Sequence, residues 1–109
     1  MISIARDSGL ITVISTFSCD PAQQAGLVDA WREAIAEFGP MPSVVAAALH
    51  RSVDGTRVVN YGQVRSLQDL EKLREMGRAK EYIARLTRFG QPDSHVYEVV
   101  YMHDRTATS

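Results

Sequence analysis

The chain has 109 residues, a formal net charge of −1 and a hydrophobic content of 45%. This length indicates one domain, residues 1–109, and a near-neutral charge without a basic stripe argues against nucleic acid as a partner. No apolar run approaches the roughly 18 residues of a membrane span, so we expect no membrane partner. Cys19 is the single cysteine, which rules out an internal disulfide and a C-x-x-C metal site. Together with an N-terminus that does not resemble a secretory signal, this predicts a cytoplasmic location.

The first half of the chain is expected to form a strand and then a helix. Residues 10–18, LITVISTFS, are rich in β-branched residues and predict a strand. Asp20 and Pro21 suit the N-cap and the first position of a helix, and Gly39-Pro40 suit its end. The apolar residues of this helix recur at helical spacing and predict one buried face: Leu27, Trp31, Ala34, Ile35 and Phe38.

The second half is expected to form a hairpin, two helical segments and a last strand. The hairpin strands are predicted over 41–53 and 56–66, with a turn at Asp54-Gly55. The segments that follow are helical over 67–76 and 77–90, with a break near Gly77, and a last strand over 94–103. The ends, 1–8 and 104–109, are expected to be tails around a core of about 10–103.

The order β-α-β-β-α-β predicts a ferredoxin-like α+β fold. Right-handed crossovers place both helical regions on one face of a four-stranded antiparallel sheet. The other face then has no cover, and an exposed sheet face with apolar residues indicates a partner. We therefore expect a homodimer in which two sheets pack face to face.

A two-residue turn at Asp54-Gly55 predicts the register of the hairpin. Leu49 then pairs with Asn60, and the same register pairs Ala47 with Gly62 and Val45 with Val64. Side chains alternate along a strand, so one face of the hairpin is predicted to lie toward the helices. Its members are Val45, Ala47, Leu49, Arg51, Val58, Asn60, Gly62 and Val64. An amide in this apolar setting needs a partner, which can be backbone, water or a ligand.

The segment HRSVDGTRVVNYGQVRS, residues 50–66, follows a strand and a helix of suitable lengths. Together they resemble the antibiotic biosynthesis monooxygenase family over about residues 10–103, and DGTRVVNYGQ is the most specific part. Members of this family are small, ferredoxin-like dimeric α+β barrels. They include cofactor-independent oxygenases that convert aromatic polyketide anthrones into quinones, and relatives that degrade haem.

The family pattern has an Asn on the third strand, a Trp four residues later, and often a Tyr on the next helix in quinone-forming members. Asn60 matches the Asn, whereas Val64 and Leu70 occupy the positions of the Trp and the Tyr. The haem-degrading members carry a His on a helix. The histidines here fall on predicted strands or at their ends, which argues against haem degradation: His50, His95 and His103.

The resemblance implies a cofactor-independent monooxygenase that oxidises an anthrone- or phenol-type aromatic polyketide, with O₂ as co-substrate. A deprotonated, electron-rich phenol or anthrone can itself transfer an electron to O₂, and the sequence contains no G-x-G-x-x-G motif or metal cluster. Asn60 would donate a hydrogen bond to the developing enolate. The expected substrate pocket around it consists of Arg51, Leu49, Val64, Leu70, Trp31 and Tyr82.

Each of these residues also has a structural interpretation. Asn60 can be bonded to backbone or water, Arg51 can be a solvated charge, and Trp31 can belong to the core. The charged residues of 68–85 read as a solvated helix face. At the level of function, a polyketide cyclase, another cofactor-free rearrangement and a non-catalytic dimeric ligand-binding module are alternatives on the same fold.

Overall fold

The computed structural model describes residues 10–38 and 44–103. The order of elements is β1 (Ile11–Ser18), the 3-10 helix η1 (Pro21–Gln23), α1 (Gln24–Phe38), β2 (Val44–Arg51), β3 (Arg57–Val64), α2 (Leu67–Glu75), α3 (Gly77–Leu86) and β4 (Gln91–Tyr97). The expected tails and the helix stop at Gly39-Pro40 lie outside the described residues. The predicted β-α-β-β-α-β order is confirmed, with the second helical region divided into α2 and α3.

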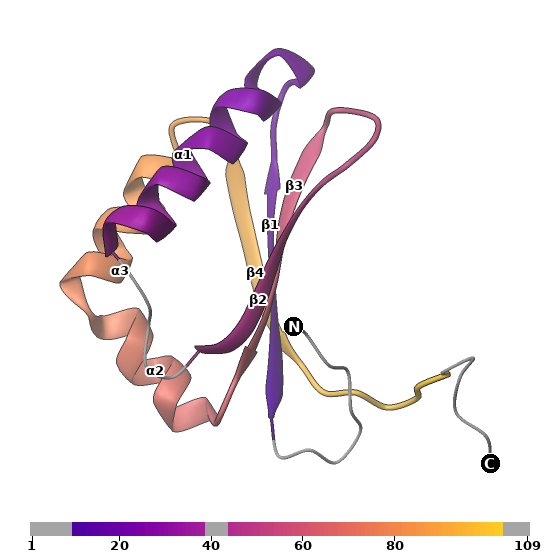
Figure 1. The fold of residues 1–109 in the computed structure, drawn as a ribbon, viewed down its shortest axis with the longest axis vertical. Helices are drawn as coiled ribbons and strands as arrows, with labels where there is room; N and C mark the ends of the chain where they lie inside the picture. The colour runs from indigo at the N-terminus through magenta and orange to yellow at the C-terminus, as the bar shows by residue number, and fades with distance from the viewer. Residues whose placement is uncertain (1–9, 39–43, 104–109) are drawn as a thin grey trace.

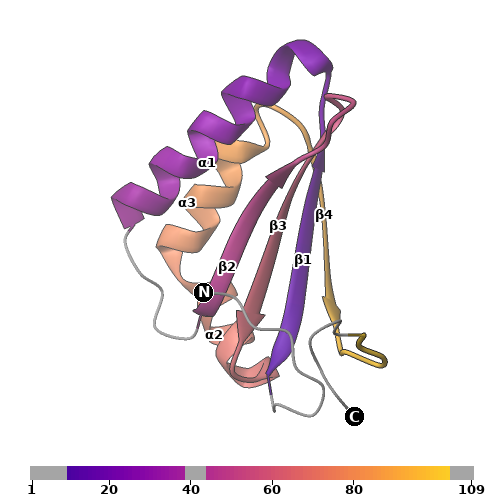
Figure 2. The ribbon, with the colours of Figure 1, turned by 45° about the vertical axis from the view of Figure 1, so that its right-hand side comes forward.

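The four strands form one antiparallel sheet in the order β2-β3-β1-β4. The three α-helices cover the same face of this sheet (Figures 1 and 2). This arrangement confirms the predicted ferredoxin-like α+β fold. None of the helices in the described part of the chain is long and apolar enough to cross a membrane.

The start of the first helix differs in detail from the expectation. Asp20 occupies the N-cap position with an extended backbone, and Pro21 follows it, but the Asp20 side chain makes no capping hydrogen bond. The first turn is a 3-10 helix, and regular α-helix begins at Gln24. Gln24 instead anchors this end, because its Nε2 donates to the carbonyl oxygens of Ser52 at 2.9 Å and Arg57 at 3.0 Å.

The hairpin turn is longer than predicted. The Ser52 N–H donates to the Arg57 carbonyl at 2.9 Å, so the connection runs from 53 to 56 rather than being a two-residue turn. Asp54 organises it by accepting hydrogen bonds from the Ser52 hydroxyl and from the N–H and hydroxyl of Thr56. Gly55 has φ +83, a backbone conformation that favours glycine. Because the loop is longer by one residue on each side of Asp54-Gly55, it keeps the predicted pairing of Leu49 with Asn60.

The predicted register is wrong at the start of β2. Val44, not Val45, pairs with Val64, because a bulge lies between Val44 and Ala46. A bulge inserts one extra residue and exchanges the faces of the side chains that precede it. Val44 therefore faces the helices, whereas Val45 is 50% exposed. The rest of the predicted hairpin register, including Ala47 opposite Gly62, is confirmed.

The predicted break between the last two helices is confirmed at Met76. The Ser66 hydroxyl caps the start of α2 by accepting from the Asp69 N–H at 3.1 Å. Met76 then adopts an extended backbone with ψ 134, which ends α2 and starts α3. The helical direction therefore changes between Glu75 and Gly77.

The last strand was predicted too far along the chain. Strand β4 covers Gln91–Tyr97, and the segment 98–103 is not a strand. Within the described residues β4 pairs with β1 alone, from Ser18 opposite Gln91 to Thr12 opposite Tyr97, and β1 begins at Ile11. Pro92 lies within β4, and the sheet tolerates a proline there because β4 is an edge strand.

The core is packed between α1, α3 and the hairpin end of the sheet. Its fully buried members are Phe17, Leu27, Trp31, Val58 and Leu86. The rings of Phe17 and Trp31 meet edge to face with centroids 5.1 Å apart. The predicted apolar face of the first helix is buried at Leu27, Trp31 and Ala34, whereas Ile35 is 48% exposed. The Phe38 side chain is not among those described.

Candidate active site

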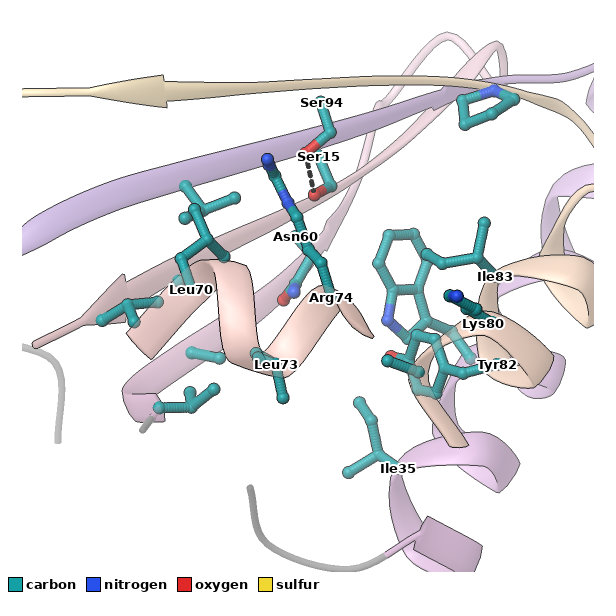
Figure 3. Close-up of a pocket in the computed structure, with 18 of the residues that line it drawn as sticks. Ser15, Ile35, Asn60, Leu70, Leu73, Arg74, Lys80, Tyr82, Ile83 and Ser94 are labelled. Carbon is teal, nitrogen blue, oxygen red and sulfur yellow. Dashed lines mark hydrogen bonds between the residues drawn. The ribbon is translucent and has the colours of Figure 1, made fainter. Parts of the chain in front are cut away.

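A pocket of about 810 Å³ lies between the helices and the sheet. This volume is within the range of about 300–1,000 Å³ that is usual for small-molecule sites. Figure 3 shows Asn60, Leu70, Leu73 and Arg74 at one end of this pocket. Lys80, Tyr82 and Ile83 of α3 lie at the other end (Figure 3).

Asn60 belongs to a row of polar residues that crosses three neighbouring strands. It is the Cα partner of Ser15 on β1, and Ser15 is in turn the partner of Ser94 on β4. All three residues line the pocket. The hydroxyl oxygens of Ser15 and Ser94 are 3.0 Å apart and hydrogen-bonded (Figure 3). Adjacent strands are about 4.8 Å apart, so the row presents polar groups at this spacing along the sheet.

The Asn60 side chain is half-buried and makes no hydrogen bond with any residue that the structure describes. The interpretation of Asn60 as an amide bonded to neighbouring protein groups is therefore not supported by these contacts. Its N–H₂ and carbonyl remain available to water or to a ligand in the pocket. Such an amide can donate to an oxygen that becomes negatively charged and accept from a hydroxyl.

The walls beside Asn60 are aliphatic. Val64 of β3 and Leu70 of α2, which stand at the Trp and Tyr positions of the family pattern, both line the pocket and are buried. Ala47 and Gly62, the paired residues next to Leu49 and Asn60, also line it. Short side chains on the sheet leave volume under the helices, which is where the cavity lies.

Aromatic groups line the pocket from α1 and α3. Trp31 and Tyr82 meet edge to face with ring centroids 6.4 Å apart, and both line the pocket. Burial raises the pKa of Tyr82 above its usual value, and the neighbouring Trp31 side chain opposes this rise without cancelling it. The Tyr82 phenol therefore stays protonated at neutral pH and can act as a hydrogen-bond donor. The buried Trp31 Nε1 reaches no acceptor at hydrogen-bond geometry among the described residues.

Two residues of the predicted pocket lie elsewhere. Leu49 packs against the buried core cluster, and Arg51 is exposed at the end of β2 opposite Val58. Neither lines the pocket. Leu49 and Arg51 were predicted on the correct face of the hairpin. At this end of the sheet, however, Phe17 and Val58 help to fill the space between the sheet and the helices. The cavity begins only beyond that packed region.

The structure adds pocket residues that the sequence interpretation did not single out. Ser15 and Ser94 come from β1 and β4, whose register with the hairpin was not predicted. Arg74 and Lys80 also line the pocket, although the charges of this region were interpreted as a solvated helix face. Strand alternation from Phe17 would have placed Ser15 toward the helices, whereas no sequence signal separates Arg74 and Lys80 from their charged neighbours.

The histidines lie outside this pocket. His50, His95 and His103 are exposed, and His95 Nε2 lies 2.6 Å from Asp93 Oδ1. Among residues 10–38 and 44–103 there is no group of three or more His, Cys, Asp or Glu side chains placed to hold a metal ion. His103 was predicted at the end of the last strand, but it lies beyond the end of β4.

Comparisons with known proteins find similar sequences among proteins named as monooxygenases. No family model matches the chain. The tetracenomycin-F1 monooxygenase of Streptomyces glaucescens is 28% identical over 108 residues, which is 98% of this chain and 96% of that protein. A monooxygenase of Streptomyces coelicolor, ActVA-Orf6, solved in complex with nanaomycin D, is 27% identical with a TM-score of 0.74, covering 88% of this chain and 92% of the other.

A third relative shows the same fold at lower identity. SnoaB of Streptomyces nogalater, a cofactor-independent oxygenase, has a TM-score of 0.75 at 14% identity, covering 87% of this chain and 97% of that protein. This likeness concerns the fold alone. Taken with the two closer sequences, it confirms that the chain resembles the antibiotic biosynthesis monooxygenase family over nearly its whole length.

Proposed function

We propose that the protein is a cofactor-independent monooxygenase that oxidises an anthrone- or phenol-type aromatic polyketide with O₂. The observation that carries the proposal is Asn60, an amide without a hydrogen-bond partner among the described residues, on the sheet side of a pocket of about 810 Å³. Relatives named as monooxygenases at 27–28% identity support it. The relative ActVA-Orf6 was solved in complex with nanaomycin D, and this supports a polycyclic ligand in the pocket of this protein.

The proposed reaction begins with loss of a proton from the substrate, whose carbonyl becomes an enolate oxygen. Asn60 donates a hydrogen bond to this oxygen, and the aliphatic wall of Val64 and Leu70 strengthens that bond by excluding water. The enolate transfers one electron to O₂, and the resulting radical pair combines into a carbon-bound peroxide. The peroxide takes up a proton to replace the one that the substrate lost, and cleavage of its O–O bond together with the remaining C–H bond then yields a ketone and water. An anthrone CH₂ and one O₂ thus become a quinone C=O and one H₂O.

Trp31 and Tyr82 supply the aromatic surface that Val64 and Leu70 do not. The Trp31 indole is almost fully buried, so it forms part of the pocket wall without offering an open ring face. The Tyr82 phenol, whose pKa is raised by burial, can donate a hydrogen bond to a second substrate oxygen. Ser15 and Ser94 extend the polar row beyond Asn60 and can orient further oxygens of the substrate.

We further propose that the protein acts as a homodimer through the face of the sheet opposite the helices. In the described residues this face is not covered by a helix (Figure 1). It carries Ile14, Val59 and Tyr61, which are half-buried, and the ring pair of His95 and Tyr97. Sedimentation analysis of the purified protein tests this assembly, and a monomer at micromolar concentration would contradict it.

A rearrangement without O₂, such as cyclisation, is the second candidate. It is favoured by Val64 and Leu70, which replace the aromatic residues typical of quinone-forming members. A pocket filled by Val64, Leu70 and Trp31 would have favoured a non-catalytic module, but a cavity of about 810 Å³ remains beside them. Product formation under anaerobic conditions distinguishes a cyclase from an oxygenase, since only the oxygenase needs O₂.

The test of the proposal is oxygen uptake by purified, metal-free protein with the model anthrone dithranol. We expect uptake faster than autoxidation. Asn60→Ala should lower the turnover number by about 10²-fold, in line with the loss of one donor to a developing oxyanion. Gln68→Ala, which removes an exposed amide of α2 that does not line the pocket, is the matched control and should retain activity. Full activity of Asn60→Ala would exclude the proposed role of this amide.

A further inference from the structure

The pocket is bordered by basic side chains and by no acidic one among the described residues. Arg74 lies in the last turn of α2, and Lys80 lies near the start of α3. Both line the cavity (Figure 3). The chain as a whole has a formal net charge of −1. The positive border of the pocket is therefore a local feature and does not follow from the composition.

Neither cation is neutralised by an ion pair within the described part of the chain. Arg85 on the same helix as Lys80 behaves differently, because it forms a bidentate pair with Glu37 at 2.6 and 3.0 Å and also contacts Glu81 at 3.4 Å. The acidic residues of α2 and α3 do not line the cavity: Asp69, Glu71, Glu75 and Glu81.

The break at Met76 brings the two cations to the same cavity. Positions six residues apart on one continuous helix would point roughly 120° away from each other. Met76 is extended, so α3 starts with a new direction after α2 ends. This local backbone change allows Arg74 and Lys80, from two different helices, to border one apolar space.

We propose that the pocket binds its polycyclic aromatic ligand as an anion, with Arg74 and Lys80 as the residues that select the negative charge. The aromatic character of the ligand rests on the proposed function, whereas its charge follows from the lining. Two sources of the charge share this chemistry: a carboxylate substituent, or a ring oxygen ionised as phenolate or enolate. In either case the apolar walls reduce screening and strengthen the attraction.

Trp31 makes the inference measurable without catalysis. It is the single tryptophan of the chain and it lines the pocket. An anthracene bound there should quench its fluorescence. We would titrate the full chain with anthracene-2-carboxylate and with the neutral anthracene-2-carboxamide, which has nearly the same shape. The carboxylate should bind about tenfold more tightly at low salt, as expected for one charge-assisted contact at a partly exposed site.

Variants test which cations are responsible. Arg74→Gln and Lys80→Gln should each weaken binding of the carboxylate about threefold, and should leave binding of the carboxamide unchanged. Lys72→Gln on α2 is the matched control, since Lys72 does not line the pocket. Arg74→Lys should retain the preference for the anion. Raising the salt concentration should reduce the preference in the wild type.

A second ligand distinguishes the two sources of charge. If the ring oxygen is the charged group, bound dithranol should show the absorption spectrum of its anion at a pH where free dithranol is neutral. The titration is carried out under nitrogen. A preference for the carboxylate with no such spectral change assigns the charge to a substituent.

Equal binding of the carboxylate and carboxamide together with neutral bound dithranol would overturn the inference and leave the proposed function standing. An equal loss in Lys72→Gln would overturn the assignment to Arg74 and Lys80. Absence of quenching by every one of these aromatic probes would overturn the proposed function as well.

Discussion

The two ends of the space between the helices and the sheet are built differently. At the hairpin end, Phe17, Leu27, Trp31, Val58 and Leu86 fill it completely, and none of these side chains is more than 1% exposed. At the other end the same two layers enclose a pocket of about 810 Å³. The same strands, β1 and β3, run through both ends, so the difference does not come from the backbone of the sheet.

Side-chain size and helix continuity explain this difference. At the packed end, α1 contributes Leu27 and Trp31 directly onto Phe17 and Val58. At the open end, the sheet presents Ala47, Gly62 and the serines of the polar row, and the covering helix is interrupted at Met76. One end therefore provides most of the packing, and the other can provide a binding site at a smaller cost in stability.

The largest expected effect is on stability at the packed end. Leu27→Ala removes a fully buried side chain and should lower the free energy of unfolding by about 2–5 kcal/mol. Ile35→Ala, on the same helix but lining the pocket and 48% exposed, should cost about 1 kcal/mol or less. Urea denaturation of both variants measures the comparison. Equal losses would show that the two ends are not energetically distinct.

Tyr82 lies where the two ends meet, because it packs against the core and lines the pocket. Tyr82→Phe should reduce dithranol turnover about tenfold, as expected for one lost hydrogen bond.

Burial raises the pKa of Tyr82, so the neutral phenol stabilises the fold below the ordinary tyrosine pKa of about 10 and this contribution is lost at higher pH. Unfolding measured from neutral to alkaline pH should show a smaller alkaline loss in Tyr82→Phe than in the wild type. An identical loss in both proteins would contradict the assignment.

A smaller effect is expected from the polar row. Ser15→Ala removes one partner of the Ser15–Ser94 hydrogen bond and should raise the KM for dithranol about threefold, with little change in kcat. Ser18→Ala, at the exposed end of the same strand, is the control. A decrease confined to kcat would indicate that Ser15 acts in the chemical step and not in orienting the ligand.

The smallest effect is expected in the hairpin turn, far from the pocket. Hydrogen bonds from Thr56 and then Ser52 hold the pKa of Asp54 at about 2, below its ordinary value of 3.8. A lowered pKa stabilises the fold above the unfolded value, and this contribution is lost as the pH falls from about 4 to about 2. Asp54→Asn should be less sensitive to pH in this window when unfolding is followed by circular dichroism. Unchanged sensitivity would show that other carboxylates dominate.

Local sequence signals predicted the elements around the site well but missed part of the site itself. Asn60 was placed on the helix-covered face because any even loop length preserves the face on which it lies, and the loop centred on Asp54-Gly55 also preserves its pairing with Leu49. Val45 was misplaced because a bulge has no clear sequence signature. The strand of 94–103 was shifted because its apolar residues resemble a strand, whereas its true extent depends on the length of its partner β1.

The sequence by itself determined the order of elements, the ferredoxin-like fold and the face on which Asn60 lies, because these follow from side-chain periodicity, turn residues and chain connectivity. Only the tertiary structure decided which residues surround the cavity. It excluded Leu49 and Arg51, whose end of the sheet is filled by the core, and it added Ser15, Ser94, Arg74 and Lys80. A cavity exists where side chains from distant segments leave the space between two layers unfilled, and no local pattern in the chain predicts the combined volume of those side chains.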